Sequence, residues 1–203
     1  MKTRLLIVLS ILILSNAKAQ VLGISPVKIW TNNYEIENPV GIGMSVAKTI
    51  WLITLKGEYI FARSNRTYSG NISSGFMAVP MTPNENIKST SLYSAYEFSL
   101  SFALLSRKSN MDINIGLGFS FDSYSADRVG STTGKKASFE SGIKNGPFVS
   151  FSGDYYIVNA LRIGLCYKIK GFTQGTIATD IELPFANIKI VHELQINLLY
   201  SLN

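Results

Sequence analysis

The stretch from Met111 to Asp122, MDINIGLGFSFD, decides the fold class of this chain. Large apolar side chains occupy its odd positions, and Asp, Asn, Gly and Ser occupy its even positions. Because successive side chains of a β-strand point to opposite faces, this alternation predicts a strand with one apolar face and one small, polar face. The helical spacing of three and four residues between apolar positions is almost absent after the N-terminal segment.

The same alternation recurs from residue 40 to the end of the chain. It is found over residues 40–47, 51–62, 92–104, 149–156, 161–170 and 188–202. Residues 21–30 are also strand-like, but Pro26 suits an edge or a bulge, and the pattern leaves open which of their side chains face inward. We therefore expect an all-β fold, a closed antiparallel up-and-down transmembrane β-barrel of about eight strands.

The predicted connections between the strands alternate in length. Short turns lie near residues 48–49, 106–110 and 158–159, an intermediate loop covers 31–38, and long loops cover 64–90, 124–144 and 172–187. Outer-membrane barrels have short periplasmic turns and longer outer loops, so both chain termini are expected on the periplasmic side. The loops 64–90 and 124–144 either bind a surface or envelope protein or pack over the barrel mouth.

The composition of the polar faces distinguishes a membrane barrel from a secreted soluble sandwich, which is the alternative fold. A sandwich crowds its water-facing side with charged and polar side chains, whereas here Gly, Ala and Ser separate single charges. Small residues suit the narrow interior of an eight-stranded barrel. The apolar faces run on for about 9 to 14 residues, close to the ~9–11 that a tilted strand needs to cross a bilayer. We expect these faces to contact outer-membrane lipid.

The N-terminus has the layout of a signal peptide. A basic MKTR is followed by the apolar run LLIVLSILIL, and the AKA at residues 17–19 matches the small-residue pattern of a cleavage site. This apolar run is too short to span a bilayer as a helix. We expect residues 1–19 to be removed by cleavage near Ala19–Gln20, and residues 20–203 to form one barrel domain in the bacterial outer membrane.

Charge and cysteine content exclude several classes of partner. Lys2, Arg4 and Lys18 lie in the predicted signal peptide and account for three of the net charge of +6, which leaves +3 on the mature chain. Such a small excess gives no reason to expect a nucleic-acid partner. Cys166 is the only cysteine, so the chain has no internal disulfide and no multi-cysteine metal site. We expect no cofactor.

The polar faces of the predicted strands carry the strongest candidate for a functional site, a charge network in the lumen. Its basic members are Lys56, Arg162, Lys168, Lys170 and Lys189, and its acidic members are Glu58, Glu97, Asp112, Asp122, Asp154 and Glu193. Isolated charges inside a narrow barrel are costly, whereas paired ones are tolerated, so we expect a salt-bridged plug. A thin, ion-selective pore is the alternative, although eight strands leave little room beyond side chains.

The last strand supports a family resemblance. Leu194, Ile196, Leu198 and Tyr200 lead to an aromatic residue near the C-terminus, as in many outer-membrane barrels, although the chain ends in Leu-Asn rather than Phe. Together with the predicted signal peptide and the hairpins that follow it, this pattern resembles the small outer-membrane β-barrel proteins of the Bacteroidota. The resemblance implies the fold and the location, and it carries no residue-level function.

No residue set identifies a catalytic, cofactor-binding or metal-binding site. His192, the only histidine, falls in the outward-facing set of the last strand, and without a placed Ser or Asp partner it supports catalysis only weakly. We expect a non-enzymatic barrel that serves as a structural anchor or presents its loops to a partner. A narrow passive channel is the alternative, and an enzyme acting on outer-membrane lipid is the most distant one.

Overall fold

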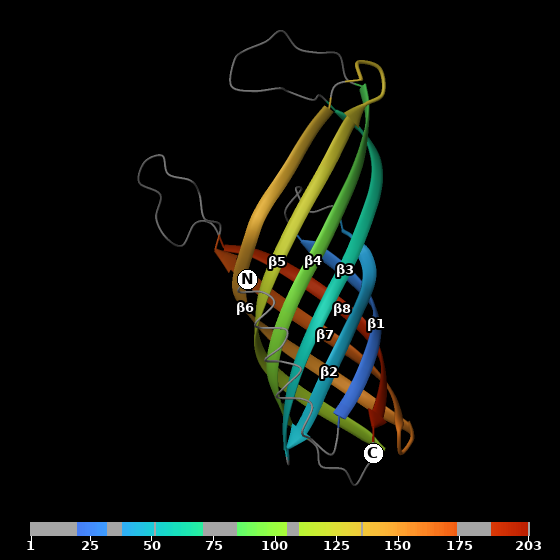
Figure 1. Ribbon diagram of the computed structural model, residues 1–203, viewed down its shortest axis with the longest axis vertical. Coiled ribbons are helices and arrows are strands. Elements are labelled where there is room, and N and C mark those ends of the chain that lie inside the picture. The colour runs from blue at the N-terminus through green and yellow to red at the C-terminus, as the bar shows by residue number, and fades with distance from the viewer. Residues whose placement is uncertain are drawn as a thin grey trace.

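Eight antiparallel strands follow one another around a closed barrel in chain order, and β1 pairs with β8 to complete it (Figure 1). The strands are β1 (Gln20–Thr31), β2 (Val40–Ile50), β3 (Ile53–Gly70), β4 (Glu85–Ala103), β5 (Met111–Gly130), β6 (Lys136–Val158), β7 (Leu161–Thr173) and β8 (Ile188–Leu202). The computed structural model describes residues 20–31, 38–50, 52–70, 85–104, 110–134, 136–173 and 188–202. Within these residues, no helix is long and apolar enough to span a membrane.

The two faces of the strands differ as the alternation predicts. Large apolar side chains cover the outside of the barrel, where Leu117 is 62 % exposed and Leu165 is 53 % exposed. Inside the barrel, the charged side chains of Glu97 and Lys170 are buried. A water-soluble protein shows the opposite arrangement, so this exterior is suited to lipid. The predicted all-β class, the eight strands and the closure of the barrel are confirmed.

The short connections lie together at one end of the barrel, which we call the turn end. They cover residues 51–52, 104–110 and 159–160, close to the predicted short turns. We call the opposite end, where β1 is joined to β2 and β7 to β8, the loop end. The predicted loop 172–187 falls between β7 and β8, and most of it lies outside the described residues, as does the predicted signal peptide.

β1 has apolar residues on both faces, and its place in the barrel decides how they point. Val27 and Ile29 face the interior and are buried, whereas Leu22 and Ile24 are exposed on the outside. Lys28 consequently lies on the outer face and is exposed. Because alternation alone does not distinguish two partly apolar faces, pairing with β2 and β8 was needed to settle the facing.

Pro26 interrupts the ladder between β1 and β8. The two strands pair up to Ile24 and again from Val27, in the same register on both sides of the interruption. Proline has no backbone N–H to donate, which accounts for the gap. Inside the barrel, the Ser25 hydroxyl donates to Asn197 Oδ1 at 2.7 Å and links the strands there. The expectation of an edge or a bulge at Pro26 is therefore wrong.

Glycines on the inner faces keep the barrel narrow. A Cβ built on Gly41 would overlap the carbonyl oxygen of Phe61 on the neighbouring strand β3, and a Cβ built on Gly118 would overlap the ring of Phe148. Backbone and large rings therefore occupy the volume in which side chains would otherwise stand. The predicted use of small residues in a crowded lumen follows from this close approach.

Four neighbouring strands are longer than the other four. β3 to β6 have 18, 19, 20 and 23 residues, whereas β1, β2, β7 and β8 have 12, 11, 13 and 15. Figure 1 shows β3 to β6 rising together beyond the others at the loop end. We call this part, residues 64–70, 85–94, 123–130 and 136–145, the projecting sheet.

The predicted loops 64–90 and 124–144 are wrong in part, because residues 64–70, 85–90, 124–130 and 136–144 are strands of the projecting sheet. Residues 71–84 of the first predicted loop lie outside the described residues. β3 and β4 stay paired as far as Gly70 and Glu85, and β5 and β6 are paired across most of the second range. Apart from Val129, the described outward positions in these segments are polar, since the strands have passed beyond the apolar exterior. Without an apolar face the sequence alternation disappears, although backbone pairing continues.

Candidate functional site

The lumen is divided into layers along the barrel. Toward the loop end lies a buried apolar layer made of Val27, Ile29, Ile60, Ala62, Tyr93, Ala95, Tyr124, Ala126 and Val191. The next inward positions toward the turn end carry charge. They are Glu58 beside Ile60 on β3, Glu97 beside Ala95 on β4, and Glu193 beside Val191 on β8. We call the apolar layer the apolar seal, and the charged site lies on its turn-end side.

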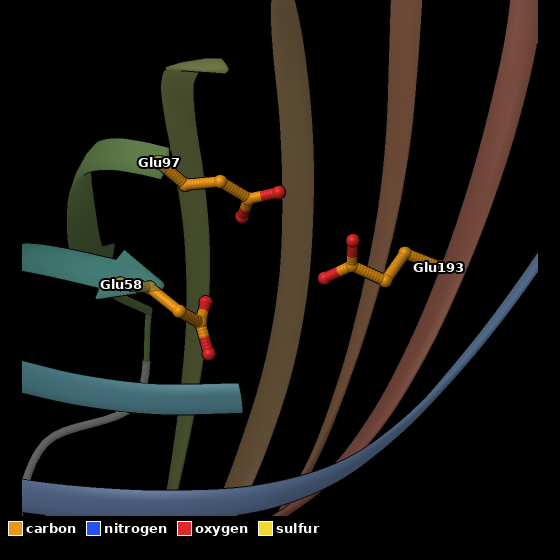
Figure 2. A group of neighbouring side chains, drawn as sticks. All are labelled: Glu58, Glu97 and Glu193. Carbon is orange, nitrogen blue, oxygen red and sulfur yellow. The ribbon is translucent and has the colours of Figure 1, made fainter. Parts of the chain in front are cut away.

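Lys168 is the centre of the charged layer. Its Nζ contacts Glu58 Oε2 at 2.5 Å, Glu97 Oε2 at 2.5 Å and Glu193 Oε1 at 2.9 Å, and all four side chains are almost fully buried. Figure 2 shows the three carboxyl groups pointing toward a common space from β3, β4 and β8. Strand register explains the meeting, because Glu58 pairs with Glu97 across β3 and β4, and Lys168 pairs with Glu193 across β7 and β8.

Lys170 forms a second centre beside the first. Its Nζ pairs with a carboxylate oxygen of Glu97, lies 2.5 Å from Glu193 Oε2 and 4.0 Å from Asp122 Oδ2, and donates to Tyr93 OH at 3.0 Å. The Tyr93 hydroxyl in turn donates to Asp122. Because Glu97 and Glu193 contact both lysines, the two centres form one network.

The charges of the central network nearly cancel. Lys56, which is partly exposed, lies 3.2 Å from Glu58 Oε2 and adds a third cation. The central network thus sets Lys56, Lys168 and Lys170 against Glu58, Glu97, Asp122 and Glu193. Such pairing offsets much of the large desolvation cost of burying charge in a narrow lumen.

The three glutamates also match the spacing of a metal site, since one carboxylate oxygen from each lies within 4.8 Å of the others. Their common space holds the ammonium group of Lys168, which donates to all three. The chain thereby supplies a cation of its own at the point where a metal ion would sit. The geometry favours a structural charge cluster over a metal centre.

Three of the remaining predicted lumen residues, Asp112, Asp154 and Arg162, lie nearer the turn end. Asp112 accepts a hydrogen bond from Tyr156 OH, and Arg162 donates to the same hydroxyl at 3.3 Å. Asp154 is buried against Gly164, where a Cβ would overlap its carboxylate. The side chain of Lys189 lies outside the described part of the structure. Asp112 and Arg162 therefore form a smaller polar group, apart from the contacts of Lys168 and Lys170.

Sequence reasoning missed the apolar seal. The alternation over residues 92–104 and 188–202 puts Tyr93 and Val191 on inner faces, but it leaves the facing of Val27 and Ile29 open and so predicts no layer. The signal available was the row of apolar residues on the otherwise polar inner faces of β3, β4 and β8. Only the pairing of β1 with β8 shows that these rows meet the apolar residues of β1.

His192 lies on the outer face in an aromatic patch. Its Nδ1 is 2.7 Å from Tyr167 OH, and its ring stacks on Trp30 with centroids 5.9 Å apart. Its cross-strand neighbours are Trp30 and Ile169. Among the described outward-facing neighbours no serine or carboxylate approaches this histidine, so the arrangement resembles an interfacial aromatic cluster more than a catalytic group.

A closed antiparallel barrel with an apolar exterior and a charged, filled interior defines the class of this protein, a membrane-spanning β-barrel. No family model matches the chain. No curated protein matches it either. Solved structures do match over nearly the whole chain, and they share this architecture.

The structure of Neisserial surface protein A has a TM-score of 0.54 and 12 % identity, covering 92 % of this chain and 98 % of that one. The outer membrane protein OprG from Pseudomonas aeruginosa has a TM-score of 0.52 and 9 % identity, covering 91 % and 95 %. Ail, the attachment invasion locus protein of Yersinia pestis, has a TM-score of 0.50 and 12 % identity, covering 91 % and 97 %. At these identities the likeness shows the fold, that of small outer-membrane barrels, and a Bacteroidota origin stays a prediction.

Proposed function

We propose that this protein is a non-enzymatic outer-membrane anchor with a sealed lumen, which holds the projecting sheet out from the cell surface to contact another protein. The observation that carries the proposal is the combination of four long strands, β3 to β6, with a lumen filled along its length. The predicted signal peptide, residues 1–19, would direct the chain across the inner membrane, and cleavage near Ala19–Gln20 would release the barrel.

The orientation follows from the connections. Outer-membrane barrels keep short turns on the periplasmic side, so the turn end faces the periplasm and the loop end faces outward. The projecting sheet then stands outside the membrane. Its described outward positions are polar except at Leu92 and Val129, which suits a surface exposed to water.

Among the described residues, the projecting sheet has two edges that pair with no further strand, and we propose that these edges serve recognition. Among the described strands, β3 has β4 alone as a neighbour beyond Arg63, because β2 begins at Val40. On the other side, β7 pairs with β6 only from Phe148 onward. Unpaired backbone groups along an edge can add an extended segment of another protein. These edges support a protein partner, in place of the predicted loops 64–90 and 124–144.

The seal argues against the channel alternative and makes conductance a direct test. Above the salt-bridged cluster, Ile29, Ile60 and Tyr93 close the lumen with apolar atoms. We expect refolded wild-type protein in planar bilayers to give no reproducible conductance steps, under conditions in which a general porin does. Reproducible steps from the purified, folded barrel would favour the channel.

The partner proposal is tested by photo-crosslinking in intact cells. A crosslinking amino acid replaces Tyr68 on β3 or Ser131 at the β5–β6 turn, both exposed, and Leu117 on the lipid-facing side of β5 serves as the control. We expect a discrete protein adduct of the same mass at Tyr68 and Ser131, and none at Leu117. If every position gave the same adducts, or none, surface recognition by this sheet would be ruled out.

A further inference from the structure

The apolar exterior ends in a basic side chain on both β1 and β3. Toward the loop end, Lys28 follows the exposed Ile24 and Pro26 on the outer face of β1, and Arg63 follows the exposed Phe61 on the outer face of β3. Lys28 and Arg63 are themselves exposed on this outer face. Each basic group therefore stands where the strand passes from lipid to water, the depth at which lipid headgroups lie.

Strand register brings these two cations close together. Lys28 pairs with Val40 of β2, and Val40 pairs with Arg63 of β3, so the three side chains share one face. Two strand spacings separate the backbones of Lys28 and Arg63 by about 10 Å. Their long, flexible side chains can cover that distance and converge on one anionic group over Val40.

An aromatic patch borders the cationic pair. Trp30 is the next outward residue after Lys28 on β1, and its ring centroid lies 6.2 Å from that of Tyr167 and 5.9 Å from that of His192. The bond between Tyr167 OH and His192 Nδ1 holds both rings in place. Indole, phenol and imidazole rings of this kind combine an apolar body with a polar tip, which suits the headgroup layer.

The surroundings of the pair are electropositive. Every salt bridge within the described residues lies in the lumen, so none involves Lys28 or Arg63. Among the described outward-facing side chains, the carboxylate is that of Asp127, which lies on β5 in the projecting sheet and accepts from Ser138 Oγ at 2.7 Å. Within the described part of the chain, the two cations therefore have no protein counter-charge on this face.

We propose that Lys28 and Arg63, bordered by Trp30, Tyr167 and His192, bind the phosphate of a lipid in the outer leaflet. The acyl chains would lie against the apolar exterior below, which places the phosphate at the height of the cations. Guanidinium groups bind phosphate oxygens in a bidentate manner, and an ammonium group adds a point charge. This inference rests on the proposed outer-membrane location of the barrel.

The test measures lipid binding by fluorescence in a detergent that contains no phosphate. Trp51→Phe leaves Trp30 as the reporter, since the chain has two tryptophans. The probes are monophosphoryl lipid A, its dephosphorylated form and inorganic phosphate. We expect tight binding of the first probe alone, and about 30-fold weaker binding by the double variant Lys28→Gln, Arg63→Gln, because each basic residue contributes roughly a factor of five near an anionic lipid.

Lys88→Gln is the matched control, because Lys88 is exposed on the outer face of β4 within the projecting sheet. We expect this variant to bind as the reporter protein does. Equal affinity of the double variant, or equal binding of the dephosphorylated lipid, would overturn the lipid site, and binding of inorganic phosphate alone would point to a free anion. Heat-modifiable gel mobility is recorded for each protein, so a chain that shows no shift contradicts the membrane barrel itself.

Discussion

Replacing Lys168 by Met is expected to lower the free energy of unfolding of the barrel by about 3–5 kcal/mol, the loss typical of a buried charge left without its partner. Lys168 Nζ contacts Glu58, Glu97 and Glu193, so one substitution removes the shared cation of three buried carboxylates. Methionine keeps most of the side-chain volume, and the loss therefore reports charge rather than packing. Urea unfolding in lipid vesicles, followed by heat-modifiable mobility, measures it.

Two further variants show whether charge pairing causes that loss. Lys56→Met removes a partly exposed lysine with one salt bridge among the described residues, to Glu58 at 3.2 Å, and we expect it to cost less than about 1 kcal/mol. Adding Glu58→Gln to Lys168→Met should restore much of the stability, because the salt bridges of Glu58 are to Lys168 and Lys56, whereas Glu97 and Glu193 also reach Lys170. Wild-type stability of Lys168→Met would contradict the network.

Replacing Leu117 by Arg is expected to destabilise the folded barrel by about 2–4 kcal/mol, the range for a basic residue on the lipid face near the bilayer midplane. Leu117 stands in the middle of the outward series of β5, is 62 % exposed, and has no polar neighbour on that face. An arginine there must either enter hydrocarbon or distort the bilayer around it. The yield of the heat-modifiable form after refolding into vesicles, and its unfolding midpoint in urea, measure the effect.

Val129→Arg is the matched control for Leu117→Arg, because both residues point outward from β5. Val129 lies in the projecting sheet, beyond the apolar exterior. An arginine at that position meets water, and we expect a change within about 0.5 kcal/mol. A large loss of stability at Leu117 with little change at Val129 places the membrane boundary between these two residues of β5. Equal effects at both positions would mean that lipid does not end between them, which contradicts a sheet projecting from the membrane.

The candidate site was partly predictable because side-chain direction along a strand is a local property. Lys168 and Lys170 share a face with Cys166 through spacing alone, and the same is true of Glu58 with Lys56. Their inward direction also followed, since the opposite face is apolar. Which carboxylate meets which lysine did not follow, because Lys168 and Glu58 are 110 residues apart and come together only when the barrel closes.

The length of the strands was predictable only where lipid imposes a pattern. Phe61 and Arg63 mark the last apolar and first basic outward positions of β3, and the sequence signal stops there although the strand continues to Gly70. Beyond that point the backbone of β3 is held by pairing with β4, which leaves no periodic trace in side-chain composition. Strands in water with two polar faces therefore resemble loops when read from composition alone.

Outside β1, the sequence by itself determined which residues of the apolar part of the barrel face lipid and which face the lumen, because alternation with a period of two needs no knowledge of the neighbouring strands. Tertiary structure alone decided the facing of β1, the apolar seal, the convergence of Glu58, Glu97 and Glu193 on Lys168, and the extension of β3 to β6 into a projecting sheet. These features depend on register and closure, which set side by side residues that are far apart along the chain.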